Sequence, residues 1–196
     1  MRVRDSGMPD EAYWESLFDP AGALDGFPFL RDSTKTSRLL ELGCGYGTFT
    51  VELAQRFAGE VDTVDIDPEM VARTRKRLSA RDLKNASVFQ GNFVADDLPD
   101  RCRDYDAVVL FHIMHLEEPE ELIRRILPRI VPGGVLAFLH WRPDRETPRG
   151  PDLGIRPTLG DYQRWSRQFA LSQPVVITLH NCPHHFAVQC QKSELS

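Results

Sequence analysis

The sequence has few cysteines and no long apolar run. Its four cysteines, at positions 44, 102, 182 and 190, form no C-x-x-C pair, so neither a disulfide framework nor a zinc site is expected. No apolar run reaches the roughly 18 residues that a membrane-spanning helix needs, and the first 15 residues lack the apolar stretch of a secretion signal. We therefore expect a cytoplasmic protein that does not bind membranes.

The chain also lacks an excess of positive charge. Its 24 Lys and Arg residues against 29 Asp and Glu residues give a formal net charge of −5. The densest basic stretch, residues 73–84, is interrupted by Asp82 and has the spacing of an exposed helix face. Proteins that bind nucleic acid usually carry a basic surface, so no nucleic-acid partner is expected.

Strand-like and helix-like segments alternate along most of the chain. The 196 residues contain 41% hydrophobic and 27% charged residues, which suits one globular domain with its own core. The alternation predicts an α/β fold with a doubly wound, mostly parallel sheet and helices on both faces. Strands are expected at residues 38–43, 61–67, 86–93, 105–116 and 132–141, and helices at 48–58, 68–83, 118–131 and 159–170.

The two ends of the chain depart from this alternation. Residues 1–36 are rich in Asp, Pro and Gly and predict an N-terminal cap or lid with a short amphipathic helix. Residues 37–141 form the predicted core, and residues 142–170 a proline-rich loop followed by a helix. Residues 171–196 contain two strand-like runs around a turn, which predict a C-terminal antiparallel hairpin at the sheet edge.

A glycine cluster lies where the first expected strand meets the first core helix. Gly43, Gly45 and Gly47 allow a sharp backbone bend and close approach of a ligand, at the strand end where ligands bind in such sheets. Asp65, at the end of the next strand, is suited to accept hydrogen bonds from both hydroxyls of a ribose. The alternatives are a purely structural turn and, for Asp65, a helix cap, a role that Asp67 fits better.

The glycine spacing also bears on the kind of nucleoside. A dinucleotide site usually has the pattern G-x-G-x-x-G, whereas this chain has G-x-G-x-G preceded by Glu41. A carboxylate at that position would repel a pyrophosphate. The pattern therefore favours a positively charged nucleoside.

Residues 39–54 (LLELGCGYGTFTVELA) and 61–70 (VDTVDIDPEM) together resemble the class I S-adenosylmethionine-dependent methyltransferases. The resemblance extends from about Leu39 to Trp141. It implies a Rossmann-like sheet of seven strands with a C-terminal antiparallel hairpin, a single methyltransferase domain over residues 1–196, S-adenosylmethionine as cofactor and S-adenosylhomocysteine as product.

The resemblance also implies roles for individual residues around the cofactor. Asp65 would bind the ribose hydroxyls, Ile66 would contact the adenine, and Phe93 would stack on it. Asn92 stands where many members have the acid that contacts the adenine amino group. The methionine part would be surrounded by Glu41, Gly43, Cys44, Gly45, Gly47 and Phe111.

Three histidines near the ends of central strands are candidates for contact with the methyl acceptor. His112 and His140 are the candidate catalytic bases. Many members of the family carry a histidine at the position of His115 without using it in chemistry, so His115 is treated as a substrate-contacting candidate. For all three, a structural histidine is the alternative, and for His184 and His185 a solvated turn is expected.

Further substrate-binding candidates lie in the cap and in the proline-rich loop. Tyr13 and Trp14 would close over the cofactor, with plain helix packing as the alternative. Trp141 and Arg142 begin the loop in which such enzymes commonly build the acceptor pocket. The arginines of this region are also candidates for an acidic acceptor, with a solvated charged face as the alternative: Arg142, Arg145, Arg149 and Arg156.

These observations predict a methyltransferase that acts on an oxygen or nitrogen atom of a small molecule by in-line substitution, with secondary metabolism as the expected context. No set of acids suits a divalent metal, since Asp106 lies at the wrong end of its strand, so metal-independent transfer is expected. The alternatives are a peptide or protein methyltransferase, a non-catalytic cofactor-binding regulatory module, and a nicotinamide dehydrogenase. The expected oligomeric state is a monomer or a homodimer.

Overall fold

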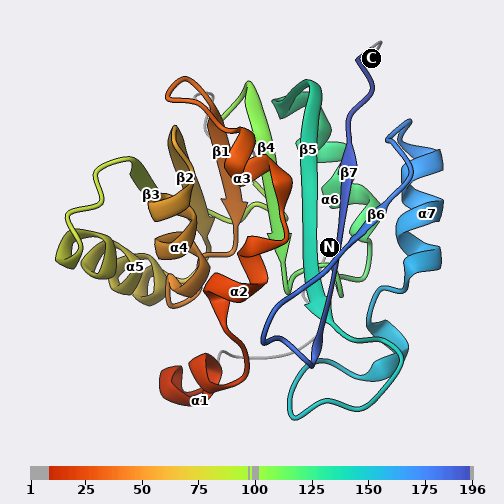
Figure 1. Cartoon of the computed structure of the whole chain (residues 1–196), viewed down its shortest axis with the longest axis horizontal. Helices are drawn as coiled ribbons and strands as arrows, with labels where there is room; N and C mark the ends of the chain where they lie inside the picture. The colour runs from red at the N-terminus through yellow and green to blue at the C-terminus, as the bar shows by residue number, and fades with distance from the viewer. Residues whose placement is uncertain (1–8, 97, 99–101, 195–196) are drawn as a thin grey trace.

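A seven-stranded mixed sheet forms the centre of the molecule in the computed structural model, which describes residues 9–96, 98 and 102–194. The first eight residues of the expected cap and the last two of the expected hairpin lie outside this range. The strand order is β3-β2-β1-β4-β5-β7-β6 (Figure 1), and β7 runs antiparallel to both of its neighbours, β5 and β6. The strands are β1 (Arg38–Leu42), β2 (Glu60–Asp65), β3 (Ala86–Gln90), β4 (Tyr105–Phe111), β5 (Ile130–Trp141), β6 (Val175–Ile177) and β7 (His185–Gln191). This confirms the predicted fold class.

Helices cover both faces of the sheet. Leu39 and Val109 pack in one core, with the N-terminal helices and α4, while Leu40 and Leu110 pack in another, with α6 and α7. Because successive strand residues point to opposite faces, each central strand contributes to both cores. The helices are α1 (Glu11–Ser16), α2 (Pro20–Asp25), α3 (Pro28–Asp32), α4 (Thr48–Arg56), α5 (Pro68–Ala80), α6 (Pro119–Ile126) and α7 (Leu159–Gln168).

Capping residues explain where two of these helices begin and end. Asp67 caps α5 by accepting a hydrogen bond from Glu69 N at 2.8 Å, and Pro68 supplies a backbone angle already suited to the first turn. The sequence predicted that this helix would continue to residue 83, but it ends at Ala80 and Asp82 adopts a left-handed conformation with φ 53°. At α7, Thr158 and Asp161 form a reciprocal capping box.

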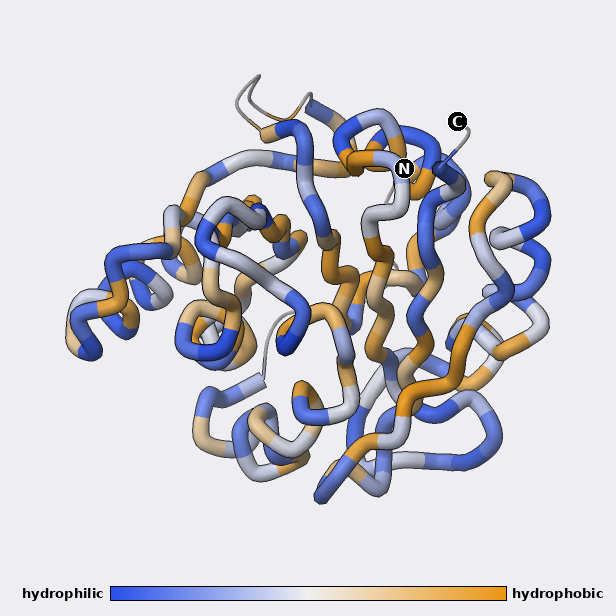
Figure 2. Tube along the Cα trace, turned by 45° about the horizontal axis from the view of Figure 1, so that its top comes forward, coloured by the Kyte–Doolittle hydropathy of each residue, from blue (hydrophilic) through white to orange (hydrophobic). Residues whose placement is uncertain are grey.

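The central strands of the sheet consist mainly of apolar residues. Val108, Val109 and Leu110 of β4 are fully buried, as expected for a central parallel strand covered on both faces. Figure 2 shows hydrophobic residues concentrated along the central strands and hydrophilic ones along the outer helices. Among the helices described, none combines the length and apolar character needed to cross a bilayer.

Several irregular segments meet at one edge of the sheet. Helix α1 and the loop of residues 142–156 lie at the lower edge in Figure 1, where the parallel strands end. The turn between β6 and β7 reaches the same edge, because His185 pairs with Trp141, the last residue of β5. This edge is where ligands bind in doubly wound sheets.

Candidate active site

The glycine cluster forms a left-handed bend between β1 and α4. Gly43, Gly45 and Gly47 all have positive φ angles, of 85°, 50° and 78°. Residues other than glycine rarely adopt such backbone angles. A Cβ atom on Gly47 would lie 2.8 Å from the Thr74 hydroxyl of α5. The bend therefore needs glycine both for its backbone angles and for the close approach of α4 to α5.

Asp65 lies against this bend, with a carboxylate that the backbone already orients. Its Oδ2 accepts a hydrogen bond from Gly45 N at 2.9 Å, and its Oδ1 accepts one from Asp67 N at 2.9 Å. The side chain is largely buried, yet it lines a cavity. Since each carboxylate oxygen accepts more than one hydrogen bond, Asp65 keeps acceptor capacity for a ligand with two adjacent hydroxyls.

The cavity beside Asp65 has a volume of about 200 Å³ and walls that are mainly apolar. Helix α1 borders it on one side, the glycine bend on another, and the residues after β2, β3 and β4 complete it. The lining residues are Trp14, Gly43, Cys44, Gly45, Tyr46, Thr48, Phe49, Asp65, Ile66, Phe93, Phe111, His112 and Ile113. A carboxylate for a diol, apolar rings and a bare backbone bend in one cavity fit a nucleoside such as S-adenosylmethionine.

Three of the predicted cofactor residues do not line this cavity. Glu41 is buried behind the bend and accepts a hydrogen bond from Thr50, and desolvation raises its pKa to about 7. Asn92 accepts hydrogen bonds from Val94 N and Ala95 N at 3.1 Å each, which stabilise a local turn. Gly47 serves the packing of α4 on α5.

His112 follows β4 in a left-handed conformation, with φ 58°. Such backbone strain in a non-glycine residue concentrates at functional sites. Its backbone N–H donates to Leu139 O at 2.7 Å, and its ring lies among other rings, with a centroid distance of 5.1 Å to Trp14 and 5.6 Å to Trp141. The neighbouring strand therefore holds His112 at the wall of the cavity.

The other two predicted histidines lie behind His112. His140 is fully buried and its Nε2 shares a 3.1 Å hydrogen bond with Nδ1 of His115. Desolvation lowers the pKa of both His112 and His140 well below the usual histidine value. These rings are therefore neutral at neutral pH, and His112 alone of the three lines the cavity.

Helix α1 borders one side of the cavity. Trp14 lines the cavity, while Tyr13 is mostly exposed and donates its hydroxyl to Pro148 O at 3.2 Å. The Tyr13 contact therefore links the cap to the 142–156 loop, and a Trp14–Trp141 ring contact of 6.2 Å links the cap to the end of β5.

The arginines of the loop are occupied by contacts within it. Arg142 forms two hydrogen bonds with the Asp144 carboxylate, at 2.8 and 2.7 Å. Arg156 is buried and donates to the carbonyl groups of Pro151, Arg142 and Arg145. Arg156 thus binds the loop backbone, in place of the role toward an acidic acceptor that the sequence suggested for it.

His185 corrects another expectation. The sequence predicted a solvated turn, but the His185 side chain is buried, with ring contacts to Trp141, His112 and Phe18. Sequence reasoning also missed Thr48 and Phe49 of the cavity wall. The sequence could have predicted these two residues, because both directly follow the glycine bend. For His185 and Phe18 no local signal exists, because the sheet edge brings them in from opposite ends of the chain.

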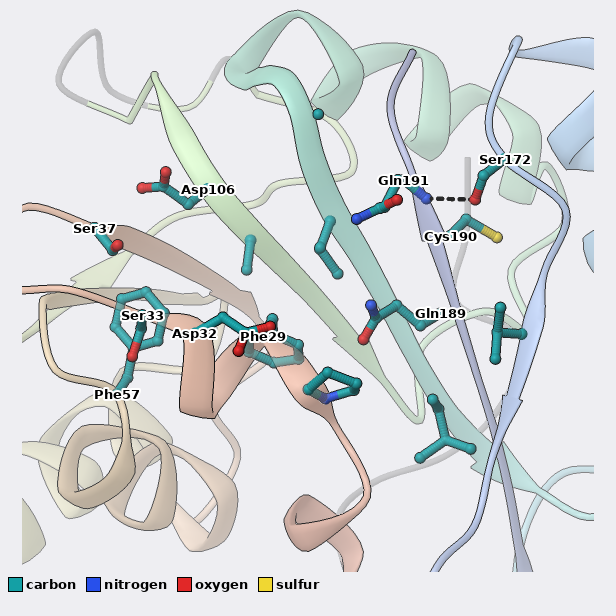
Figure 3. A pocket seen from close by; sticks show the side chains of 16 residues that line it. Phe29, Asp32, Ser33, Ser37, Phe57, Asp106, Ser172, Gln189, Cys190 and Gln191 are labelled. Carbon is teal, nitrogen blue, oxygen red and sulfur yellow. Dashed lines mark hydrogen bonds between the residues drawn. The ribbon is translucent and has the colours of Figure 1, made fainter. Parts of the chain in front are cut away.

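A second, larger cavity of about 470 Å³ lies at the other end of the sheet. Figure 3 shows Phe29, Phe57 and Asp106 at one side of it and Gln189 and Gln191 at the other. It lies at the amino ends of the parallel strands β4 and β5, far along the sheet from the glycine bend. Neither the glycine bend nor Asp65 contributes to it.

The strand order, the glycine bend and the carboxylate at the end of β2 define a nucleoside-binding protein of the doubly wound α/β class. Residues 39–134, about half of the chain, match the family model described as a methyltransferase domain. The chain belongs to the class I S-adenosylmethionine-dependent methyltransferases, as the sequence resemblance predicted. The cofactor of this family is S-adenosylmethionine.

Two similar proteins of known name are methyltransferases. N-demethylindolmycin N-methyltransferase of Streptomyces griseus is 27% identical over 135 residues, which cover 68% of this chain and 56% of that protein. Demethylmenaquinone methyltransferase of Listeria monocytogenes is 25% identical over 107 residues, which cover 54% of this chain and 45% of that protein. The chain thus spans about half the length of the curated relatives it matches.

Solved structures share the fold across nearly the whole chain. A SAM-dependent methyltransferase from Aquifex aeolicus superposes with a TM-score of 0.74 at 22% identity and covers 93% of this chain and 94% of that chain. The plantazolicin methyltransferase BpumL, in complex with SAH, has a TM-score of 0.70 at 11% identity, covering 93% and 88%. At these identities the likeness concerns the fold.

Proposed function

We propose that this chain transfers a methyl group from S-adenosylmethionine to an oxygen or nitrogen atom of a small molecule, by in-line substitution without a metal ion. The observation that carries the proposal is the cavity that connects Asp65 and the glycine bend to the ring of His112. Within it, Asp65 binds the ribose hydroxyls and Ile66 and Phe93 contact the adenine. Cys44, Gly43 and Phe111 border the methionine part.

In this reaction the protein acts mainly by positioning the reactants. S-adenosylmethionine supplies an electrophilic methyl group when it is bound. The chain orients an acceptor, excludes water with rings such as Trp14 and Trp141, and accepts a hydrogen bond from the acceptor group. Nε2 of His112 is buried without a hydrogen-bond partner, and the low pKa of this histidine leaves the ring neutral. In this proposal His112 carries its proton on Nδ1, and Nε2 accepts the hydrogen bond of the acceptor group. Because the lowered pKa makes the ring a weak base, the proton is released to water after the methyl group is transferred.

The surroundings of His112 favour a small acceptor over a polymer. Aromatic rings from α1, β5 and β7 enclose His112, whereas a polypeptide acceptor would favour an open groove lined by acids. The names of two relatives, N-demethylindolmycin N-methyltransferase and demethylmenaquinone methyltransferase, also refer to small molecules. A relative that methylates 23S rRNA matches only 59 residues, 13% of that protein.

We further propose a division of labour within one domain. Residues 37–141 hold the cofactor. The acceptor side is formed by the cap (residues 1–36, described from residue 9), by the loop and helix of residues 142–170, and by the hairpin (residues 171–196, described to residue 194).

Calorimetric titration and a product assay test this proposal together. S-adenosylmethionine and S-adenosylhomocysteine should bind with one-to-one stoichiometry, while NAD should not bind. Release of S-adenosylhomocysteine should occur with members of a panel of hydroxyl- and amine-bearing metabolites, and not with peptides or 23S rRNA fragments. Tight cofactor binding with no turnover on any acceptor would favour the regulatory module, and turnover on peptides alone would favour the protein methyltransferase.

A further inference from the structure

The second cavity, of about 470 Å³, lies on the same face of the sheet as the N-terminal helices. Helix α3 borders it on one side and the edge strand β6 on the other, and β4, β5 and β7 contribute its floor. Ala107, Val135 and Phe29 of its lining belong to the buried core. The volume falls within the range of about 300 to 1,000 Å³ that is typical of small-molecule sites.

Two hydroxyl groups in the wall of the second cavity are used by the fold. Ser33 donates to Leu30 O at 2.7 Å, and Ser172 donates to Gln173 O at 3.3 Å. Each hydroxyl oxygen also accepts a bond from a backbone N–H, at 3.0 and 2.9 Å, as Figure 3 shows for Ser172 and Gln191. These two serines therefore offer a ligand no free donor.

Gln189, on the floor of the second cavity, carries an acceptor that the fold leaves unsatisfied. Its carboxamide points from β7 toward α3 (Figure 3), and its Oε1 is buried without a hydrogen-bond partner. Buried polar atoms are almost always hydrogen-bonded, so this oxygen calls for a donor. Because the last torsion of a glutamine side chain is soft, the oxygen can turn toward a donor within the cavity.

The charge of the second cavity is negative. Asp32 of α3 and Asp106 of β4 contribute to its lining, and both residues are exposed. Arg38 N donates to Oδ2 of Asp106 at 2.7 Å, which orients that carboxylate. The described residues that line the cavity include no Lys, Arg or His. Since a cleft with charges of one sign concentrates ligands of the opposite sign, this cavity favours a cation.

We propose that the second cavity binds a small organic ammonium ion with an apolar body. The ammonium group donates a hydrogen bond to Oε1 of Gln189 and is attracted by the two carboxylates, while the apolar body packs against Phe29 and Val175. The cavity lies at the amino end of β4 and the cofactor cavity at its carboxyl end. Its occupant is therefore neither the cofactor nor the methyl acceptor, and the site goes beyond the proposed function.

Other classes of ligand fit these surroundings less well. In the described part of the chain, no group of three or more His, Cys, Asp or Glu side chains is arranged to hold a metal ion. A carboxylate ligand would be repelled by Asp32 and Asp106. An alcohol would donate a hydrogen bond to Gln189 but would gain no attraction from the two charges.

Nitrogen NMR of the glutamine side chains tests the proposal with matched probes. Protein labelled with ¹⁵N-glutamine is titrated at neutral pH with 2-phenylethylamine, which is then a cation, with 2-phenylethanol and with 3-phenylpropionate. We expect the amine to shift the carboxamide signal of Gln189 but not that of Gln168, which is exposed on α7. The alcohol and the carboxylate should bind at least fivefold more weakly. Equal responses to amine and alcohol, or an unshifted Gln189 signal with all three, would overturn the proposal.

A second titration, with saturating S-adenosylhomocysteine, separates this site from the cofactor site. The affinity for 2-phenylethylamine should stay within twofold of its value without the nucleoside. Loss of amine binding would place the amine in the cofactor cavity and refute the second site. Calorimetry with S-adenosylhomocysteine on the same samples reports separately on the proposed function.

Charge variants of the lining separate recognition from folding. Asp32→Asn combined with Asp106→Asn should weaken amine binding at least fivefold, whereas Asp82→Asn, at an exposed position beyond the end of α5, should leave it unchanged. Gln189→Glu keeps the shape of the side chain and adds a carboxylate. It should strengthen amine binding at least threefold, which a folding defect would not do. Unchanged amine affinity in the double variant or in Gln189→Glu would refute the proposal.

Discussion

Asp65 illustrates how a single side chain is prepared for its ligand. Backbone N–H groups of Gly45 and Asp67 fix its two carboxylate oxygens, so little ordering remains to be done on binding. The orientation depends on the glycine bend, because only that bend turns Gly45 N toward β2.

Removal of this carboxylate should weaken cofactor binding. For Asp65→Ala we expect the affinity for S-adenosylmethionine to fall about 10- to 150-fold, through the loss of charge-assisted hydrogen bonds worth about 1.5 to 3 kcal/mol. Isothermal titration calorimetry measures this directly. Asp67→Ala is the matched control, because its carboxylate caps α5 and does not line the cavity. It should cost about 1 kcal/mol of stability with affinity within twofold, and equal affinity losses in both variants would contradict the assignment.

Glu41 should make folding stability depend on pH. Burial raises its pKa from 4.5 to about 7, so between these values the folded chain binds more protons than the unfolded chain. The contribution of Glu41 is therefore fully present below pH 4.5 and is lost as the pH rises through 7. Glu41→Gln removes this dependence.

Urea unfolding at pH 5 and pH 8 measures the effect. The change in the free energy of unfolding between the two pH values should differ between the wild type and Glu41→Gln by about 2 kcal/mol, with the variant relatively more stable at pH 8. Parallel pH profiles for the two proteins would show that Glu41 is ionised in the folded state.

Ion pairs link helix α1 to α5. Glu11 pairs with Arg73 and Arg77, and Glu15 pairs with Arg77 at 2.6 Å. Partly exposed ion pairs each contribute only about 0.2 to 1 kcal/mol. Helix α1, which carries Trp14 over the cavity, is therefore the element expected to open most easily.

Arg77→Met should loosen this helix without unfolding the domain. We expect the equilibrium constant for local opening of α1 to increase about two- to fivefold, because the substitution removes ion pairs that together contribute up to about 1 kcal/mol. Hydrogen exchange of the Trp14 to Leu17 amides reports it. Lys76→Met, at an exposed position of the same helix α5, is the control. Exchange in α1 that responds equally to both substitutions would mean that the ion pairs do not hold it.

Elements with a regular pattern could be predicted from the sequence, and side chains in irregular segments could not. The apolar run of β4 and the proline and acids at the start of α6 act locally, so the starts of this strand and helix were predicted within one residue. Their ends were wrong, because β4 ends at Phe111 and not at residue 116, and α6 ends at Ile126 and not at residue 131. Glu41 and Asn92 were assigned to the cofactor by resemblance, but hydrogen bonds with Thr50 and with the Val94 and Ala95 amides direct them elsewhere. Such partners become visible only after the chain folds.

The arrangement of the whole sheet explains why the site forms where it does. The order in which strands are added to the sheet reverses between β3-β2-β1 and β4-β5, so the connections that leave β1 and β4 diverge around a crevice. The sequence predicted this sheet, but the burial of His185 depends on β7 running antiparallel to β5. That pairing joins segments more than 40 residues apart, and no local pattern carries it.

The free energy of unfolding of the whole domain should depend on the packing of the central strand β4. Leu110→Ala should cost about 2 to 5 kcal/mol in the free energy of unfolding, because the cavity left in a fully buried position cannot close completely. Urea unfolding measures the loss. Cofactor affinity of the folded fraction should stay the same, since Leu110 packs in the core with α6 and α7. Val176→Ala, at a half-exposed edge position, should change stability by less than about 0.5 kcal/mol.

A crystal structure with S-adenosylhomocysteine tests most directly whether the glycine bend and Asp65 form the cofactor site. We predict the nucleoside in the cavity beside Gly45, with both ribose hydroxyls within hydrogen-bond distance of the Asp65 carboxylate. A nucleoside bound elsewhere, for instance in the larger cavity near Phe29 and Gln189 (Figure 3), or an Asp65 side chain that makes no contact with it, would contradict the account.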